Sequence, residues 1–356
     1  MAKVLFLTPW YPSEKDAMSG LFVQKHVEAV RAQGIDVRVI CSQGWRDTWR
    51  QWKTLQRERW MPDVVQLNVI QKQGVLALWL KKRYGIPYVI IEHWTGYLPE
   101  NRLVQPHRLH TRFMKLICRN AEAVMPVSHH LGKAMQDLGF TCQRWEKINN
   151  VVDDFFYKNS EVRSQKSEVR SQKSEKKNLL HISCVDEAHK NIKGILRAVK
   201  TISKERQDFE LSLVGISIDH EEVKAYGESL QLPSGMIHWC GELTPQQVSE
   251  AFDQADVFVL NSNYENAPVV ISESIVKGVP IVSTHVGGIP EMMNSECGIL
   301  IEPDNDEQLT EALRTMLDHY PDYDRNTIRR LGNQYSFAHV GKQLKEIYDS
   351  CLHRNI

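Results

Sequence analysis

Two glutamates, Glu265 and Glu273, have seven residues between them in a stretch that joins a predicted strand to a predicted helix. The apolar run at 256–260 predicts a buried strand. Pro268 suits the first turn of a helix, where the missing N–H costs nothing. Gly278 follows as a residue that favours the left-handed end of a helix. Glu265 should therefore lie in the loop before the helix and Glu273 within it.

The beginning of this predicted helix could bind an anion. Backbone N–H groups near Pro268, Val269 and Val270 should have no partner within the helix, and such groups favour a phosphate. The two flanking carboxylates could accept paired hydrogen bonds from vicinal hydroxyls, which sugars and riboses offer. On local chemistry alone, an ordinary α/β unit with a solvated glutamate and a capping turn explains the stretch equally well.

Three further pieces surround the glutamates in a fixed order. They are S-x-Y-E ending at Glu265, G-x-P-I-V-S-T beginning at Gly278, and G-G-x-x-E ending at Glu291. This cluster resembles the E-x7-E region of retaining glycosyltransferases of family four (glycosyl transferases group 1). The resemblance implies an α/β protein of GT-B architecture, with two facing Rossmann-like domains and parallel sheets. It also implies an enzyme that moves a sugar from a nucleotide-diphosphate sugar to an acceptor.

The resemblance also implies site residues. His93, after the predicted strand 88–92, and Glu265 would be catalytic and contact the sugar, while Lys190 would hold the diphosphate and Glu273 the ribose. The remaining donor-binding residues would be Gly20, Gly241, Asn266, Ala267, Pro268, Val269 and Val270. We expect Glu265→Gln to abolish most transfer and to leave the fold intact, because a loop carboxylate contributes little to a core.

Some positions depart from the family pattern. In the first loop, Ser19-Gly20 stands where the family usually has Gly-Gly. Cys184 stands where the family usually has the arginine that, together with the lysine at position 190, holds the diphosphate. An arginine would supply a charge-assisted hydrogen bond, so its loss should lower donor affinity unless Lys193 replaces it.

Alternating strand and helix patterns divide the chain. Residues 1–152 form a predicted acceptor-side domain, completed by a helix at about 337–356. Residues 178–336 form a predicted donor domain, and 153–177 a linker that contains a duplicated S-E-V-R-S-Q-K heptad. The heptad has no apolar seam and should be a polar spacer. Strands are expected at 3–8, 36–41, 64–68, 88–92, 123–127, 179–184, 211–214, 237–240, 257–260, 281–284 and 299–301.

Composition excludes several classes of protein. Hydrophobic residues make up 42% and charged residues 25% of the 356, as in soluble globular proteins. No apolar run is long enough to span a bilayer, and the first residues lack a secretory signal. Seven scattered cysteines favour reduced thiols in a cytoplasm. We predict no metal, because capping of the following helix by aspartate explains the D-x-D at 304–306. We also predict no cofactor and no nucleic-acid partner.

Residues 44–60 place Trp45, Trp49 and Trp52 at helical spacing among arginines and lysines. Residues 1–150 also carry 22 Lys and Arg against 12 Asp and Glu. Two interpretations stay open: the tryptophans pack into the core and the cations are solvated, or this face docks on an anionic membrane. In the second case the protein would be peripheral on an inner membrane face, where a lipid-linked acceptor would meet it. The acceptor is expected to be a saccharide or a lipid-linked molecule.

Two other functions remain compatible with the sequence. A nucleotide-sugar epimerase of the same architecture would act without an acceptor. A non-catalytic protein that binds nucleotide sugars is made plausible by Cys184. The sequence names neither the sugar, the base nor the acceptor.

Overall fold

The computed structural model describes residues 2–14, 16, 18–105, 108–158 and 176–353. The chain forms two compact units: unit 1 comprises Met1–Val152 and Gln334–Ile356, and unit 2 comprises Asp153–Asn333. The duplicated heptad at 160–173 lies outside the described residues. Residues 153–158, which we expected in the linker, belong to unit 2 and include the short helix α6 (Asp154–Tyr157).

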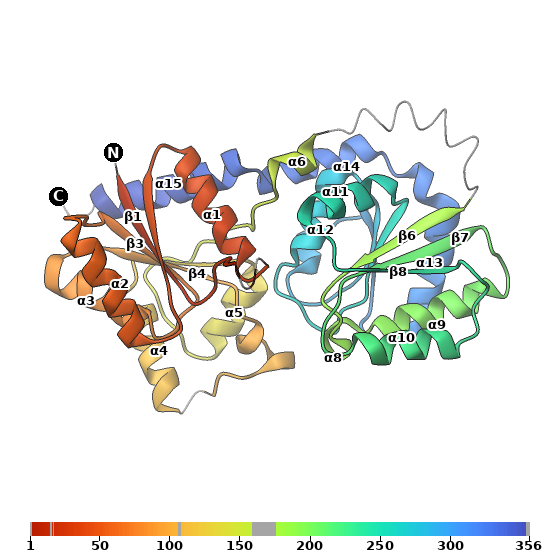
Figure 1. The fold of residues 1–356 in the computed structure, drawn as a ribbon, viewed down its shortest axis with the longest axis horizontal. Helices are drawn as coiled ribbons and strands as arrows, with labels where there is room; N and C mark the ends of the chain where they lie inside the picture. Colours follow the sequence, from red (N-terminus) through yellow and green to blue (C-terminus); the bar gives the residue numbers. More distant parts are fainter. Residues whose placement is uncertain (1, 15, 17, 106–107, 159–175, 354–356) are drawn as a thin grey trace. The chain divides into compact units, whose positions relative to one another are not determined.

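Unit 1 is built on a five-stranded parallel sheet with the order β2-β1-β3-β4-β5 (Figure 1). The central strands are mostly apolar and almost entirely buried, as expected for a sheet covered on both faces. The strands are β1 (Lys3–Thr8), β2 (Asp36–Cys41), β3 (Val64–Asn68), β4 (Tyr88–Glu92) and β5 (Ala123–Pro126).

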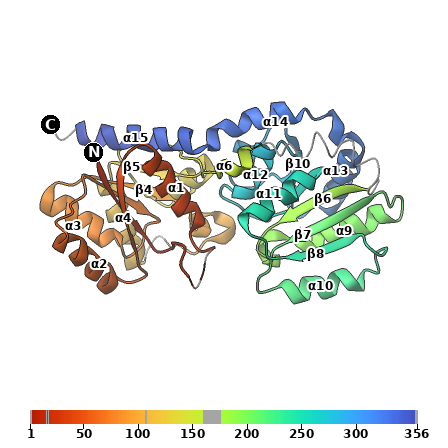
Figure 2. The same ribbon diagram turned by 45° about the horizontal axis from the view of Figure 1, so that its top comes forward.

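Among the described residues of unit 1, six α-helices flank this sheet, and α15 comes last of them in the chain. Helix α15 packs against α1, and Figures 1 and 2 both show the two helices side by side. Gly341 permits the close contact, since a Cβ there would lie 2.5 Å from the carbonyl oxygen of Ala29. The helices are α1 (Leu21–Ala32), α2 (Trp45–Arg57), α3 (Gly74–Tyr84), α4 (Leu109–Asn120), α5 (His129–Asp137) and α15 (Phe337–His353).

Unit 2 contains a six-stranded parallel sheet with the order β11-β10-β9-β6-β7-β8. In this order β6, β9 and β10 are neighbours, so the loops after their carboxyl ends lie together, where such sheets bind ligands. The strands are β6 (Lys177–Ile182), β7 (Phe209–Val214), β8 (Ile237–Gly241), β9 (Val257–Leu260), β10 (Ile281–Thr284) and β11 (Gly298–Ile301).

Helices cover both faces of the second sheet (Figure 2). Apolar residues of α9, α10 and α13 form one core with one face of the sheet, and Phe252 of α11 packs against Phe258 on the other face. The helices are α8 (Glu187–Lys190), α9 (Ile192–Ser203), α10 (His220–Ser229), α11 (Pro245–Gln254), α12 (Val269–Lys277), α13 (Asp306–His319) and α14 (Arg325–Leu331).

The predicted fold class is confirmed: both sheets are parallel and alternate with helices. Some boundaries were wrong. The strand expected at 179–184 is β6, which begins two residues earlier and ends at Ile182, because its pairing with β7 begins at Lys177 and not at the first apolar residue. The cap of α13 is Asn305, whose side chain accepts from the N–H of Gln308, and not an aspartate. Among the described residues, no helix is long and apolar enough to cross a membrane.

Candidate functional site

A buried ion pair joins the loop after β6 to the loop after β9 in unit 2. Lys190, the last residue of α8, donates to Oε1 of Glu265 at 2.5 Å. Both residues are almost fully buried, with exposed fractions of 8% and 5%. The resemblance placed Lys190 and Glu265 at one site, and here their side chains are in direct contact. Lys190 is therefore not an ordinary surface lysine.

Three groups converge on the Glu265 carboxylate. Besides Lys190, the Ser262 hydroxyl donates to Oε1 at 2.8 Å, and Nε2 of His189 lies 3.5 Å from the same oxygen. Burial alone would raise the pKa of Glu265, but the charge of Lys190 and the contact with His189 outweigh it and hold this pKa at about 2. Glu265 is therefore ionised at neutral pH. Its hydrogen bonds to the described residues all reach Oε1, which leaves Oε2 to accept from a hydroxyl of a ligand.

The two loops are also held together by backbone contacts. The backbone N–H of Asn263 donates to the carbonyl of His189 at 2.8 Å, and its side chain donates to the carbonyl of Ala188 at 2.9 Å. The His189 ring stacks on Tyr264 with centroids 4.2 Å apart, and its Nε2 lies 2.8 Å from the Tyr264 carbonyl oxygen. These contacts fix the backbone on both sides of the Lys190–Glu265 pair.

Gly287, in the turn after β10, approaches the same loop closely. Its φ is +55°, and a Cβ added there would lie 1.6 Å from the carbonyl oxygen of Glu265. Only glycine fits this contact. The G-G-x-x-E piece is thus part of the site because it lets the turn after β10 pack against the Glu265 loop.

The N-terminus of α12 differs from that of α9. At α9, the Glu187 carboxylate accepts from the N–H groups of Ile192 and Lys193, and the side chain of Asn191 accepts from Gly194. At α12, the cap residue is Pro268 and no side chain caps the helix. The N–H groups of its first turn therefore have no capping side chain, as an anion-binding helix end requires.

The other predicted donor-binding residues of this segment lie around that helix end. Asn266 and Pro268 are buried, whereas Ala267, Val269 and Val270 are half-buried. Glu273 lies one turn into α12 and is half-buried. Burial and the nearby Asp153 raise the pKa of Glu273 to about 8. The two carboxylates of the E-x7-E spacing therefore differ in charge state at neutral pH.

Two further predictions concern Gly241 and Cys184, which both lie in unit 2. Gly241 ends β8 with φ +67°, and its carbonyl accepts from the N–H of Gly215 at 2.7 Å. Cys184 is exposed in the loop after β6, so no arginine supplies a cation there. Lys193, the suggested substitute, pairs instead with Glu222 of α10 at 2.5 Å. In this structure Lys190 is the cation that contacts Glu265.

In unit 1, the predicted residues Gly20 and His93 lie on loops at the carboxyl ends of β1 and β4. Gly20 precedes α1 with φ +70°, and a Cβ there would lie 2.4 Å from the backbone carbon of Trp10. The His93 ring contacts Phe22 of α1, with centroids 4.4 Å apart. Burial, with a contribution from His26, lowers the pKa of His93 well below 6.5. His93 is therefore a neutral imidazole at neutral pH.

Glu92, the last residue of β4, is a functional candidate that the sequence argument missed. It is fully buried, and its carboxylate accepts from the N–H groups of Ile70, His93 and Trp94 and from the Tyr97 hydroxyl, all at 3.0–3.1 Å. Burial raises the pKa of Glu92 to about 7 despite these four donors. The carboxylate folds the H-W-T-G-Y loop and so fixes the position of His93.

Sequence reasoning missed further contacts of the donor-side loops. Ser262 and Gly287 lie within the motif pieces already singled out, so the motif spacing could have indicated them. His189 precedes Lys190 directly, but no sequence pattern shows that its ring stacks on Tyr264. Among the described residues, no group of three or more His, Cys, Asp and Glu side chains is arranged to hold a metal ion.

Two family models match the chain, and their boundary lies near that between the two units. The model of the Glycosyltransferase Family 4 domain matches residues 2–154, and the model of Glycosyl transferases group 1 matches residues 164–332. Together the matches extend over both units. The predicted family is thus confirmed independently of the site geometry.

Similarity to curated proteins is distant but extends over much of the chain. The sulfoquinovosyl transferase SQD2 of Arabidopsis thaliana is 25% identical over 289 residues, covering 77% of this chain and 52% of that protein. This chain thus spans about half the length of that relative. The putative teichuronic acid biosynthesis glycosyltransferase TuaC of Bacillus subtilis is 21% identical over 361 residues, covering 87% of this chain and 88% of that protein.

Solved structures share the fold. The sucrose-phosphate synthase of Thermosynechococcus elongatus has a TM-score of 0.78 at 17% identity, with 99% of this chain and 100% of that chain covered. Alr3699/HepE of Anabaena, solved in complex with UDP-glucose, has a TM-score of 0.75 at 18% identity, with 98% of this chain and 100% of that chain covered.

Proposed function

Because the chain belongs to the glycosyl transferases group 1, with a glycosyltransferase family 4 domain and the GT-B type of fold, we propose that it transfers a sugar from a nucleotide-diphosphate donor to a saccharide or lipid-linked acceptor. The observation that carries the proposal is the buried Lys190–Glu265 pair, which stands directly before the uncapped N-terminus of α12. The arrangement offers a cation and free N–H groups to a diphosphate and a carboxylate to a sugar.

Each residue then has a distinct part in the reaction. The phosphate leaving group gains negative charge as the glycosidic bond to it breaks. Lys190 and the N–H groups of Val269 and Val270 stabilise that charge, because fixed dipoles and cations in a water-poor site need little reorganisation. Glu265 accepts from the sugar through Oε2, and Glu273 accepts from the ribose. His93, a neutral imidazole, hydrogen-bonds the transferred sugar.

Three finer points belong to the same proposal. The E-x7-E resemblance supports retention of the anomeric configuration. The likeness to TuaC supports a place in the synthesis of a surface polysaccharide. Seven free cysteines, of which Cys184 and Cys240 are exposed, support a reducing cytoplasm. We also propose that a hexose is transferred without metal or cofactor, so turnover should continue in the presence of a chelator.

A two-step experiment tests the proposal. Thermal-shift measurements with UDP-, GDP- and ADP-sugars should show that one nucleotide class raises the melting temperature, because a ligand that binds only the native state stabilises it. Proton NMR with that donor and candidate oligosaccharides should then show a new glycosidic signal of the donor's anomeric configuration. Epimer formation without acceptor, or binding with neither hydrolysis nor transfer, would overturn the proposed reaction.

A further inference from the structure

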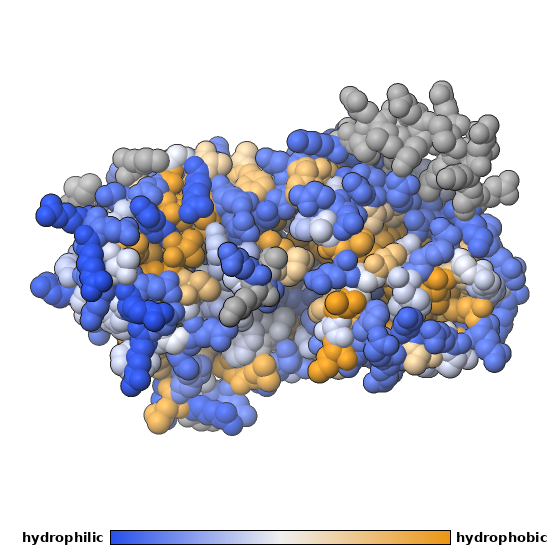
Figure 3. Space-filling model, viewed as in Figure 1, coloured by the Kyte–Doolittle hydropathy of each residue, from blue (hydrophilic) through white to orange (hydrophobic). Residues whose placement is uncertain are grey.

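Helices α2 and α3 of unit 1 carry a basic and aromatic surface that glycosyl transfer does not require. Helix α2 contains Arg46, Arg50, Lys53 and Arg57 against one acidic residue, Asp47. Helix α3 contains no acidic residue and carries three basic residues, 81–83, in its last turn. Lys81 pairs with Glu122 at 2.6 Å, so Lys82 and Arg83 supply the positive charge of α3 to this surface. The two helices contact each other, so their charges belong to one surface. In Figure 3 the most hydrophilic side chains gather over this end of unit 1.

The tryptophans of α2 do not share one environment, so neither of the two interpretations left open by the sequence holds for all three. Trp52 is fully buried in the core of unit 1, whereas Trp45 is 56% exposed and Trp49 is half-buried. Helix periodicity places all three tryptophans on one broad side of α2, but that side is buried at Trp52 and exposed at Trp45. Trp45 and Trp49 are therefore the tryptophans of α2 that an external partner can reach.

Exposed rings continue from α2 onto α3. Trp49 meets Trp79 edge-on at 4.8 Å, and Trp79 meets Tyr84 edge-on at 5.3 Å. Tyr84 is 44% exposed. Cations cover the outer rings: Arg46 lies over Trp45 at 5.4 Å, and Arg83 lies over Tyr84 at 5.1 Å. The surface thus alternates amphipathic rings with positive charge.

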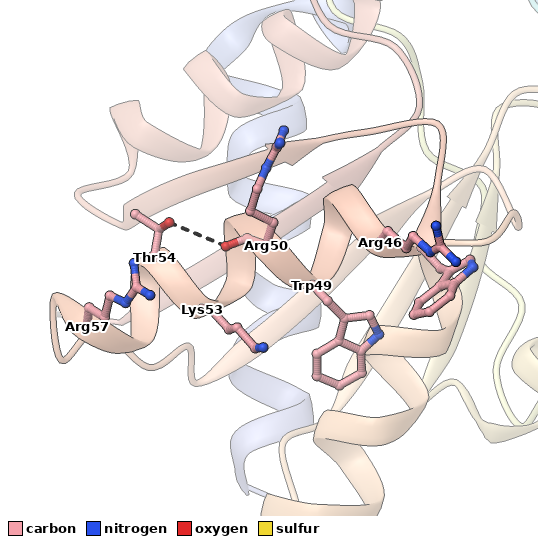
Figure 4. A pocket seen from close by; sticks show the side chains of 7 residues that line it. Arg46, Trp49, Arg50, Lys53, Thr54 and Arg57 are labelled. Carbon is pink, nitrogen blue, oxygen red and sulfur yellow. Dashed lines mark hydrogen bonds between the residues drawn. The ribbon is translucent and has the colours of Figure 1, made fainter.

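A shallow groove runs along the exposed side of α2. Figure 4 shows Trp49 and Lys53 extending from the same side of the helix, with Arg57 further along and Arg50 on the other side. The Thr54 hydroxyl donates to the Arg50 carbonyl at 3.3 Å, so it is satisfied within the helix. Acidic groups near this groove are few: Asp47 pairs with Arg50, and Glu58 lies 3.8 Å from Arg38.

We propose that the α2–α3 surface docks the protein on an anionic lipid membrane. The charge is complementary to anionic headgroups, and Trp and Tyr rings are suited to the boundary between headgroups and acyl chains. A single-stranded nucleic acid would need open ring faces for base stacking. Here Arg46 and Arg83 cover ring faces, and Trp49 and Trp79 meet edge-on, so a lipid boundary fits better.

Vesicle co-sedimentation of the full chain tests the proposal without any nucleotide sugar, so its outcome is independent of the proposed reaction. The protein should sediment with vesicles of equal parts phosphatidylglycerol and phosphatidylcholine, stay in the supernatant with phosphatidylcholine alone, and be released by high salt. The variant Lys53→Gln/Arg57→Gln should bind anionic vesicles about 30-fold more weakly, since each basic residue near the membrane surface raises the affinity about five-fold. Trp45→Ala should weaken binding about tenfold.

The matched control is Lys133→Gln/Lys342→Gln, which removes two positive charges from exposed side chains on α5 and α15 of the same unit. It should bind anionic vesicles within about two-fold of the unmodified protein, because those residues lie outside the proposed surface. Equal losses in both double variants would mean diffuse attraction and overturn the assignment. So would a protein that stays in the supernatant, a dimer in lipid-free solution that the α2 variant dissociates, or binding to a single-stranded oligonucleotide that the α2 variant abolishes.

Discussion

Lys190 and Glu265, which we propose bind the donor, also form a structural contact. Each side chain is almost fully buried, and each supplies the charge that the other needs. Removing one partner of a buried pair leaves an uncompensated charge in a poorly solvated place. This corrects the expectation that Glu265 contributes little to the fold: the glutamate lies in a loop, but that loop is buried against α8.

Glu265→Gln should therefore lose most transfer activity and also destabilise the protein. The Lys190 cation would be left without its carboxylate, at a cost of about 3 kcal/mol in the free energy of unfolding. The melting temperature should fall by about 10 °C. Calorimetry and a transfer assay measure the two effects.

The double variant Lys190→Met/Glu265→Gln is the control. With both charges gone, it should regain most of the stability that Glu265→Gln loses, because a buried ion pair replaced by uncharged groups is often neutral in stability. It should remain inactive. A Glu265→Gln protein with normal melting temperature and normal turnover would contradict both the pair and its role.

Glu273 predicts a pH dependence of donor binding. The free carboxyl has a pKa of about 8 and is mostly protonated at neutral pH. Ribose hydroxyls donate to the ionised form, so binding should lower this pKa. Donor affinity should then rise as pH increases towards 8, by up to about tenfold per unit, and level off above it. Titration calorimetry at a series of pH values measures this donor affinity. Glu273→Gln should remove the dependence, and the same rise in that variant would refute the assignment.

At the scale of elements, the N-terminus of α12 is the part that should recognise phosphate. Val269→Pro tests this directly, because Val269 is the first helical residue and the preceding Pro268 already has the extended ψ of 123° that a following proline requires. The substitution removes one N–H and should leave the helix intact. Nucleoside-diphosphate affinity should fall about tenfold, the value of one charge-assisted hydrogen bond.

Val269→Ala is the control for this change, since it also removes the branched valine side chain but keeps the N–H. Its affinity for the nucleoside diphosphate should stay close to that of the unmodified protein. If both variants bind equally well at unchanged melting temperature, the N–H groups of α12 do not hold the diphosphate.

The turn after β10 should support the Glu265 loop through Gly287. Gly287→Ala adds a Cβ that would collide with the Glu265 backbone, so the loop must shift and donor affinity should fall at least about tenfold. Gly235→Ala is the comparison, because Gly235 also has positive φ but nothing within 4 Å of an added Cβ. It should cost only about 1–2 kcal/mol in stability. Equal donor affinity in the two variants would show that the Gly287 contact is dispensable.

Sequence patterns predicted the elements well where hydropathy and backbone pairing agree. The strands at 3–8, 36–41, 64–68 and 88–92 have those bounds, because each apolar run coincides with the paired segment. The start of β6 was missed because its first two residues, Lys177 and Asn178, are polar yet pair with β7. Helix α2 shows a second limit of sequence-based prediction. Periodicity shows which residues share one face of the helix, but it does not show which part of that face is buried.

The site itself could be predicted in part. Motif spacing identified Glu265, Glu273 and the start of α12 as candidate donor-binding positions, since these lie close together in the chain. It could not show that Lys190 contacts Glu265, because that contact joins residues 75 positions apart and depends on the pairing of β6 with β9. Glu92 was missed for a similar reason: a buried glutamate is recognisable only when its four donors are placed around it.

At the scale of the whole molecule, the two units carry different kinds of candidate functional residues. Unit 2 holds the acidic and phosphate-binding residues of the proposed donor site. Unit 1 carries His93 and the basic α2–α3 surface, and α15 completes it by packing on α1. Tyr348 of α15 also donates to Gln66 of β3. Helix α15 thus belongs to the core of unit 1.

A crystal structure of the protein with the nucleoside diphosphate of its preferred donor tests the central claim most directly. We predict diphosphate oxygens within hydrogen-bond distance of the Val269 and Val270 N–H groups and of Nζ of Lys190, with the ribose hydroxyls on Glu273. A nucleotide bound clearly elsewhere, with the α12 N-terminus and the Lys190–Glu265 pair untouched, would contradict the claim.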